Sequence, residues 1–374
     1  RAVIHLRLAP LMRLRSVYKI ARLQCMKAYI EVKNGEMTLE NKYILANIYN
    51  EKAICFHSMG KFNRSKSFHQ KSFKLWNEMG YPLGKALTFN NLGVTAFEEG
   101  NYEDALTLHK ESLELEKKIN NRYGISLSLK NIGQIEIALG NYTSAIKVFR
   151  QCLEVEVAIG DQWAQSRSYL ELGLVYLGLA KPKEAIGYIR KGLLFNRNVD
   201  DKWTLIWALN ALGNAWQQLG QFIIANRFYG SALRLAEKVD HPKGILEARI
   251  GLARVHLIVG SLRIAVEHLQ AGLILSLNIG QKVLLLEILG VLGETLVRKR
   301  KIEESIKILR VVYSHDASTN VVRSRAEKAL LGLEVEIACE GFFKDSDHEL
   351  QKLIQSLMGV NIMELIGAEK VSSH

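Results

Sequence analysis

The sequence predicts an all-α fold, a right-handed α-solenoid of tandem antiparallel helix pairs. Three observations predict it. A similar segment recurs every 40 residues, apolar residues within each segment follow helical spacing, and turn-forming residues separate the helical stretches. A helix pair of this size cannot bury its apolar faces alone, so neighbouring pairs are expected to stack around one continuous core.

The repeat is clearest at two turn positions in each segment. The first turn is held by a glycine or a stand-in for it: Gly60, Gly100, Gly140, Ala180, Gly220, Gly260 and Arg300. The second turn closes each segment and is held by Gly80, Asn120, Gly160, Asp200, Asp240, Gly280 and Asn320. Glycine at the first turn accepts the left-handed conformation that ends a helix. Each segment is therefore predicted to hold two helices.

Small residues recur inside the predicted helices. Three positions after the bulky residue that follows the first turn stands Ser65, Ala105, Ala145, Ala185, Ala225, Ala265 or Ser305. A small side chain at this position lets the second helix pack closely against the first. Gly93 lies in the middle of a predicted helix at a cost of roughly 1 kcal/mol relative to alanine. We therefore expect two helices to cross there too closely for a side chain.

These positions predict the organisation of the whole chain. Seven units of 40 residues cover 41–80, 81–120, 121–160, 161–200, 201–240, 241–280 and 281–320. Residues 1–40 are predicted to form basic, degenerate leading helices that end at Asn34-Gly35. Residues 321–374 are predicted to hold a partial eighth unit with a helix over 321–341, a capping helix over 347–367 and a tail. The chain begins at Arg1, so we expect a fragment or a processed product.

Composition excludes several classes of protein. The hydrophobic content of 48% argues against wholesale disorder, and the four cysteines lie far apart with no CxxC pair. The cysteines therefore predict neither a zinc site nor a disulfide framework. No apolar run is long enough to span a bilayer, and no secretory signal is recognisable. These features predict a cytoplasmic protein.

The net charge of +12 is concentrated near the N-terminus. Residues 1–80 contain fifteen Lys and Arg against five Glu, a balance of +10, which leaves +2 for the rest of the chain. No base-reading module accompanies this charge. We therefore expect residues 1–80 to bind nucleic acid or an anionic surface only weakly, if at all. A solvated helix face or a junction to a further domain is the favoured explanation of the charge.

No pattern of catalytic or metal-binding residues is present. The ten histidines offer no close pair at ligand spacing. His69 and His109 stand one repeat apart at an apolar register position, which predicts packed side chains rather than catalytic ones. The sequence thus predicts no catalytic residue, no metal site, no cofactor and no enzymatic activity.

The repeated residues resemble the tetratricopeptide repeat family. The resemblance rests on Leu92-Gly93, Ala96, Ala105, His109 and Ser112, and one unit later on Ile132-Gly133, Ala145, Phe149 and Cys152. The family unit has about 34 residues, whereas this 40-residue form is similar to arrays in Pins/LGN polarity scaffolds, kinesin light chains and bacterial STAND, LuxR- or AfsR-type regulators. The match covers roughly residues 41–320.

The resemblance implies a binding surface on the first helix of each pair, which lines the concave groove in this family. Carried over by register, the predicted partner-binding residues are Asn47, Asn50, Asn90, Lys130, Gln134, Arg167, Trp207, Asn210, Asn214, Gln217 and Arg254. Asparagine can donate and accept at once, so a row of asparagines suits the backbone of an extended peptide. Leu170 and Leu174 interrupt the polar row, which leaves open an apolar pocket instead of one continuous track.

Three functions stay open at this point. The leading hypothesis is a non-catalytic protein- or peptide-binding scaffold, the interaction or sensor module of a larger intracellular regulatory protein. The second is a small-molecule sensor array of a transcriptional or signalling regulator. The third is the helical regulatory part of an enzyme whose catalytic domain is not in this sequence. A shared fold cannot choose among them.

Overall fold

The structure, a computed structural model, describes residues 18–33, 36–199, 201–333 and 346–358. These residues form helices joined by short turns and contain no strand. The first helices of the pairs, called A helices here, are α3 (Leu39–Ser58), α5 (Pro82–Glu99), α7 (Arg122–Ala138), α9 (Gln162–Gly178), α11 (Lys202–Gln218), α13 (Pro242–Ile258), α15 (Lys282–Arg298) and α17 (Asn320–Leu331). The second helices, called B helices, are α4 (Phe62–Glu78), α6 (Tyr102–Lys118), α8 (Tyr142–Ile159), α10 (Pro182–Val199), α12 (Phe222–Lys238), α14 (Leu262–Ile279) and α16 (Ile302–Ser314). Two further helices, α2 (Tyr18–Lys33) and α18 (Ser346–Met358), flank the series.

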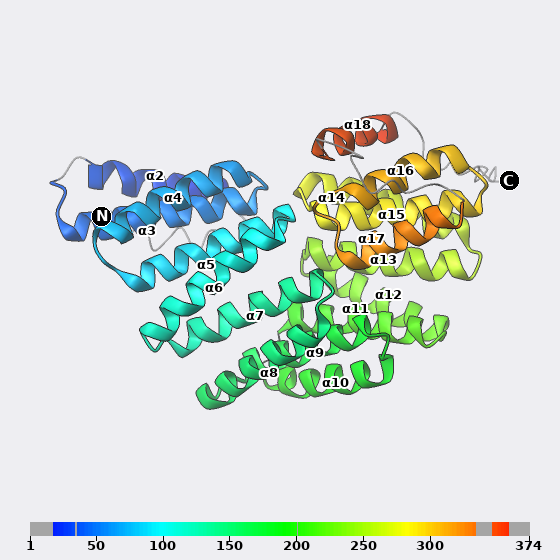
Figure 1. The fold of residues 1–374 in the computed structure, drawn as a ribbon, viewed down its shortest axis with the longest axis horizontal. Helices are drawn as coiled ribbons and strands as arrows, with labels where there is room; N and C mark the ends of the chain where they lie inside the picture. Colours follow the sequence, from blue (N-terminus) through cyan, green and yellow to red (C-terminus); the bar gives the residue numbers. More distant parts are fainter. Residues whose placement is uncertain (1–17, 34–35, 200, 334–345, 359–374) are drawn as a thin grey trace. The chain divides into compact units, whose positions relative to one another are not determined.

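The chain divides into two compact units, Arg1–Ile135 and Glu136–His374, and the division falls inside α7. Within each unit, successive helices pack side by side in chain order (Figure 1). In the second unit each A helix also contacts the next A helix, from α9 through α11, α13 and α15 to α17. The A helices of the second unit therefore form a layer of their own, and the predicted solenoid of helix pairs is confirmed.

The turns between helices follow the predicted register. All seven first-turn positions have positive φ, including the two non-glycine stand-ins Ala180 (54°) and Arg300 (57°). Among the second-turn positions, Gly80, Asn120, Gly160, Asp240 and Gly280 also have positive φ, while residue 200 lies outside the described residues.

Asn320 was wrongly predicted to close the seventh unit. It is the first residue of α17, and the preceding Thr319 caps this helix by accepting a hydrogen bond from the Val322 N–H group. The B helix α16 already ends at Ser314, so the turn lies upstream of the position that the 40-residue register predicts.

The close helix crossing predicted at Gly93 is confirmed. A Cβ atom at this position would lie 2.7 Å from Nε2 of His109 on the paired B helix. The same relation recurs between Gly173 and Ile189, Gly213 and Tyr229, and Gly293 and Leu309. Each pair is separated by 16 residues, so one glycine and one large side chain form a repeated knob and socket. The small positions from Ser65 to Ser305 are likewise buried.

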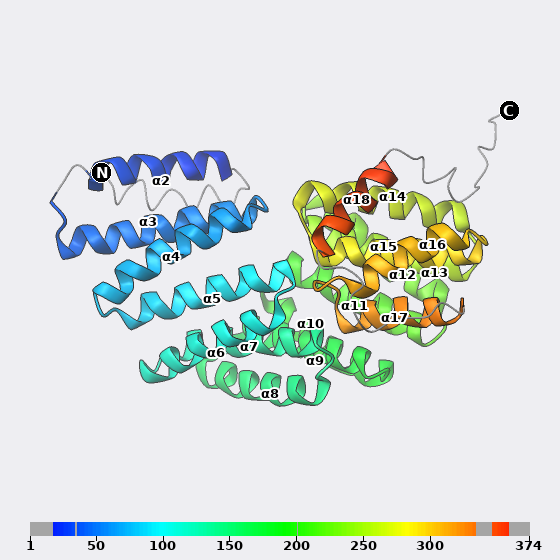
Figure 2. The ribbon, with the colours of Figure 1, turned by 45° about the horizontal axis from the view of Figure 1, so that its top comes forward.

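Both ends of the array are covered by additional helices. Cys25, Ala28 and Val32 of α2 pack against α3, alongside which α2 lies (Figure 2). At the other end, Leu350 and Leu357 of α18 join the last hydrophobic cluster through contact with α16. Terminal repeats of solenoids need such covers because their outer faces have no neighbouring repeat. The parts of the predicted leading and closing segments at 1–17, 334–345 and 359–374 lie outside the described residues.

Candidate functional site

In the first unit, paired asparagines connect successive A helices. The Asn91 side chain donates a hydrogen bond from Nδ2 to Oδ1 of Asn50 at 2.9 Å. Asn131 repeats this contact one unit later, donating to Oδ1 of Asn90 at 2.8 Å. The two bonds share a register and a direction, and they form a row of amide pairs across α3, α5 and α7.

These pairs fix the orientation of Asn50 and Asn90. Because each side-chain oxygen accepts from the next repeat, the amide nitrogens are the groups left to donate. Neither nitrogen donates a hydrogen bond to a residue in the described part of the chain. Both side chains are nevertheless more buried than a groove-lining position suggests, at 5% and 7% exposure.

The other predicted residues of the first unit lie beside this row. Asn47 is half-buried and donates to the carbonyl oxygen of Tyr43 at 2.9 Å, a bond within its own helix. Lys130 is buried and Gln134 is half-buried, and both interact with other parts of the chain. The structure thus brings Asn50 and Asn90 into contact with their amide partners. Asn47, Lys130 and Gln134 each make separate contacts within the protein.

In the second unit, Arg167 on α9 lies between two indole rings. Its guanidinium carbon is 5.0 Å from the ring centre of Trp163 and 5.7 Å from that of Trp207 on α11. We call these three residues the tryptophan–arginine stack. All three are half-buried. The stack joins two successive A helices through cation–π contacts, which grow stronger where water is partly excluded.

Asp201, the residue that caps α11, holds the stack in place. Its carboxylate accepts hydrogen bonds from Trp163 Nε1 at 2.8 Å, from Thr204 Oγ1 at 2.5 Å and from the Trp203 N–H group at 3.0 Å. Burial raises the pKa of Asp201, but these donors outweigh it and leave the pKa below the ordinary value. Asp201 therefore stays ionised and anchors the Trp163 indole.

Further along the same layer, Asn210 reaches the next A helix. Its amide nitrogen lies 3.3 Å from the Gly244 carbonyl oxygen and 3.4 Å from Oε2 of Glu247, while its side-chain oxygen is buried without a partner among the described residues. Asn214 accepts from Gln218 Nε2 at 3.2 Å. Gln217 accepts from the hydroxyl of Tyr229 at 3.2 Å.

Charged residues follow toward the end of the layer. Arg254 on α13 forms an ion pair with Glu287 on α15, with 2.9 Å between Nη1 and Oε1. The nearby charge of Arg254, together with burial, lowers the pKa of Arg325, whereas burial raises the pKa of Glu247. Charges of both signs lie close together here, so Arg254 is engaged inside the protein.

Leu170 and Leu174 belong to the core. Leu170 is 1% exposed and Leu174 packs against the same hydrophobic cluster, beside α10 and α11. Leu170 consequently presents almost no surface to a ligand. Sequence reasoning missed Trp163, although its spacing of four residues from Arg167 places both on one face of a helix. It also missed Asp201 as the anchor of that indole.

The histidines behave as the register predicts. His69 and His109 are each 1% exposed, and burial lowers their pKa values to about 3 and about 4. Both rings are therefore neutral near pH 7. No cluster of potential metal ligands occurs among the described residues. No described helix is long and apolar enough to cross a membrane.

Comparison with protein families follows the repeat register. A profile of the tetratricopeptide repeat matches residues 44–118 and 124–193, and a second tetratricopeptide repeat profile matches residues 205–239. The helix pairs within these ranges are tetratricopeptide repeats. The matched ranges contain α4, α5, α6, α8, α9 and α12 and most of α3, α7, α10 and α11. A search among curated proteins found no match.

Several solved structures are similar to the chain. NprR in complex with its cognate peptide NprX has a TM-score of 0.64 at 14% identity, with 95% of this chain and 98% of that chain covered. A Rap protein in complex with competence and sporulation factor has a TM-score of 0.63 at 12% identity, with 99% of both chains covered. A STAND protein with a tetratricopeptide repeat sensor from Pyrococcus horikoshii has a TM-score of 0.55 at 17% identity, with 74% of this chain and 43% of that one covered. At these identities the likeness shows the fold.

Proposed function

We propose that this chain is a non-catalytic regulatory scaffold that binds an extended protein or peptide segment on its A helices. The observation that carries the proposal is the row of amide pairs. The amide nitrogens of Asn50 and Asn90 recur one repeat apart in the same orientation and donate to no described residue. An extended peptide presents carbonyl oxygens at regular intervals, so it can accept from successive amides of this kind.

The similar structures support a peptide as the ligand class. NprR is described with its cognate peptide, and the Rap protein with competence and sporulation factor. Both cover nearly the whole of this chain. Only the class of ligand is inferred from these structures, because sequence identities of 12–14% do not indicate which individual contacts are shared.

A displayed library of random peptides, selected on the purified chain, tests the proposal. Binders should lose affinity about tenfold or more for the variant Asn50→Ala/Asn90→Ala, since each lost hydrogen bond is worth about 0.5–1.5 kcal/mol. A matched control is Asn63→Ala/Gln151→Ala, which removes two exposed amides from the B helices α4 and α8. Equal loss in both variants, or none in the first, contradicts the proposed surface.

The same experiment separates the small-molecule alternative. If no peptide is selected while a low-molecular-weight cell extract raises the melting temperature of the chain, the surface senses a metabolite instead. We propose a location inside the cell, where the buried thiols of Cys25, Cys55 and Cys152 stay reduced. Cell fractionation tests the location, and recovery of the protein outside the cell overturns it.

The basic N-terminal residues are expected to add little to binding. Residues 1–80 carry the excess of positive charge, and such charge alone gives weak, salt-sensitive attraction to nucleic acid or anionic lipid. Binding to single-stranded DNA or to anionic vesicles should disappear as the salt concentration rises. Tight binding that persists at high salt contradicts this expectation.

A further inference from the structure

The guanidinium of Arg167 contacts two indole rings but no described hydrogen-bond acceptor, unlike Arg254 and Arg298 on later A helices. Its guanidinium makes two cation–π contacts and forms no hydrogen bond or ion pair with a residue in the described ranges. By contrast, Arg254 pairs with Glu287, and Arg298 donates to the Leu257 carbonyl oxygen. The N–H groups of Arg167 therefore have no acceptor among the residues that the structure describes.

Two aspartates that lie close to the stack in the sequence already serve as helix caps. Asp201 accepts from Trp163, Trp203 and Thr204. Asp161, the cap of α9, accepts from the Ala164 N–H group at 2.9 Å. Each of these carboxylates thus serves a helix start, and neither pairs with Arg167.

The indole rings hold the guanidinium in a defined place. A ring contacts a guanidinium through its face, which leaves the in-plane N–H groups at the edge free for a planar acceptor. Trp163 is itself fixed by its bond to Asp201. Less side-chain entropy is then lost when an anion binds than for a lysine or arginine that is free to rotate.

We infer that the tryptophan–arginine stack is an anion subsite in which Arg167 binds a carboxylate of the bound segment through two parallel N–H···O hydrogen bonds. This inference rests on the proposed function, since it names the ligand group that one part of the A-helix surface takes. Guanidinium and carboxylate match in geometry, and their paired hydrogen bonds are among the stronger ones in proteins. The carboxylate comes either from an acidic side chain or from the C-terminus of the ligand.

Arginine side-chain NMR tests the subsite without any knowledge of the natural ligand. The Nε–Hε signal of Arg167, assigned from its disappearance in Arg167→Lys, is followed while N-acetylglutamate is added to the isotope-labelled chain. We expect a saturable shift with a Kd on the order of millimolar. Arg190 on α10 is the matched control, because it is exposed, lies on a B helix and contacts no aromatic ring among the described residues. Its response should be at least about tenfold weaker.

Variants of the probe identify the source of the carboxylate. N-acetylglutamate α-amide keeps only the side-chain carboxylate, N-acetylglutamine keeps only the terminal one, and N-acetylglutamine amide has neither. Binding of at least one single-carboxylate probe, with no binding of the neutral probe, supports the inference. An Arg167 signal that does not move, that moves no more than Arg190, or that responds better to inorganic phosphate than to every carboxylate overturns it.

Peptide selection then separates this inference from the proposed function. Peptides selected on the unchanged chain should be enriched in Asp or Glu at one position or should require a free C-terminus, and selection on Arg167→Met should lose that preference. Peptides that bind both proteins without any acidic preference contradict the carboxylate subsite and leave peptide binding intact. A saturable Arg167 shift with no selected peptide contradicts peptide binding and leaves the anion subsite intact.

Discussion

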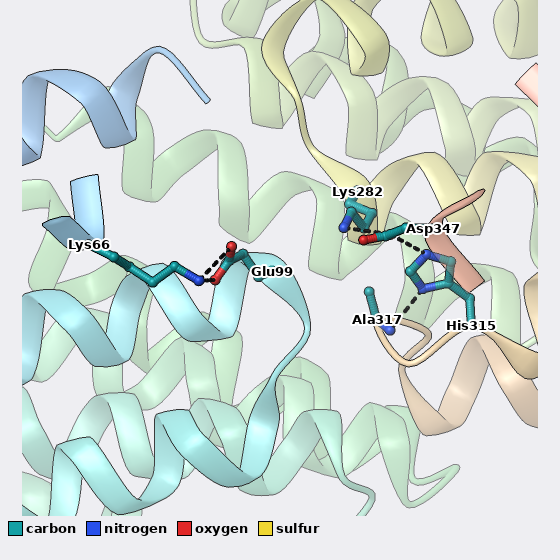
Figure 3. Close-up of polar contacts among 6 residues, drawn as sticks. All are labelled: Lys66, Glu99, Lys282, His315, Ala317 and Asp347. Atoms are coloured by element: carbon teal, nitrogen blue, oxygen red, sulfur yellow. Dashed lines mark hydrogen bonds and ion pairs between the residues drawn. The ribbon is translucent and has the colours of Figure 1, made fainter. Parts of the chain in front are cut away.

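His315 and Asp347 connect the last repeat to the closing helix, with 3.0 Å between Nε2 of the imidazole and Oδ1 of the carboxylate (Figure 3). The other ring nitrogen, Nδ1, accepts a hydrogen bond from the Ala317 N–H group at 3.0 Å. The proton of the neutral ring therefore sits on Nε2 and is donated to Asp347. The same carboxylate lies 2.8 Å from Nζ of Lys282 at the start of α15. One exposed aspartate thus ties α18 to two parts of the array.

Replacing Asp347 by alanine should loosen α18. The buried His315 ring loses its acceptor and Lys282 loses its ion pair, which together should cost about 1–2 kcal/mol of docking free energy. Amide hydrogen exchange in residues 346–358 should accelerate by about fivefold to thirtyfold.

The variant Glu349→Gln provides the control for that experiment. Glu349 lies on the same helix, and among the described residues its ion pair is a local one, with Lys352 at 2.9 Å. Its loss should leave exchange nearly unchanged. Similar acceleration in both variants contradicts the fastening role of Asp347.

Replacing Gly213 by alanine should destabilise the second unit. The added Cβ would lie 2.7 Å from Cδ1 of Tyr229, a ring that is buried and cannot move freely. Overpacking of this kind costs about 1–3 kcal/mol. Gly187 on α10 is the matched control, because nothing lies within 4 Å of its added Cβ and alanine there should stabilise the helix by up to about 1 kcal/mol. Urea denaturation measures the unfolding free energy of both variants. Equal changes in the two contradict the close packing of Gly213 against Tyr229.

Acidification should weaken the fold through its buried histidines. Burial, with a smaller effect of His57 on His69, lowers the pKa values of His69 and His109 from 6.5 to about 3 and about 4. Below pH 6.5 the two histidines bind protons in the unfolded chain but stay neutral in the folded chain. Stability is therefore complete above pH 6.5 and falls as the pH drops toward 4, by about 1.4 kcal/mol per pH unit for each histidine.

The variant His69→Phe/His109→Phe tests this pH dependence. Phe149 already occupies the same register position one repeat after His109 and is fully buried, so the fold accepts the ring. The unfolding free energy, measured by urea denaturation between pH 7 and pH 5, should fall less steeply in the variant. An unchanged slope means that other groups dominate the acid sensitivity.

Replacing Ala180 by glycine should stabilise the turn between α9 and α10. Ala180 has a φ of 54°, a left-handed conformation that costs an L-residue about 1 kcal/mol. Because glycine also gains entropy in the unfolded chain, the net effect should be a stabilisation of at most about 1 kcal/mol. The reciprocal change Gly220→Ala, at a φ of 73°, should destabilise by about 1 kcal/mol. Melting temperatures that do not move in opposite directions contradict this account.

The fold could be predicted from the sequence because its rules are local and repeated. A left-handed turn every 20 residues and a glycine opposite a large residue are each visible in one 40-residue period. Asn320 was misplaced because the last repeat departs from that period. Thr319, a favourable N-cap residue, was visible in the sequence, and it sets the start of α17 in place of the 40-residue register.

The candidate site was less predictable because it depends on contacts between repeats. Register alone placed Asn50, Asn90 and Asn210 on the A helices, but the close approach of neighbouring helices decides that all three are buried. Sequence reasoning did not foresee that Asn91 binds Asn50 and that Asn131 binds Asn90, although each donor lies 41 residues after its acceptor. The environment of Arg167 depends on Trp163 and Trp207 meeting across two helices, which no single repeat reveals.

The row of amide pairs has a direction, since each bond takes its oxygen from the earlier repeat and its amino group from the later one. The first three repeats are therefore not interchangeable modules, even though their packing residues nearly repeat. A repeat moved to another place in the chain would keep a donor and an acceptor but would lose the two asparagines that they bind. Substitutions at Asn50 are then expected to occur together with substitutions at Asn91, and those at Asn90 with those at Asn131. Such correlated pairs would indicate which repeats are neighbours in the chain.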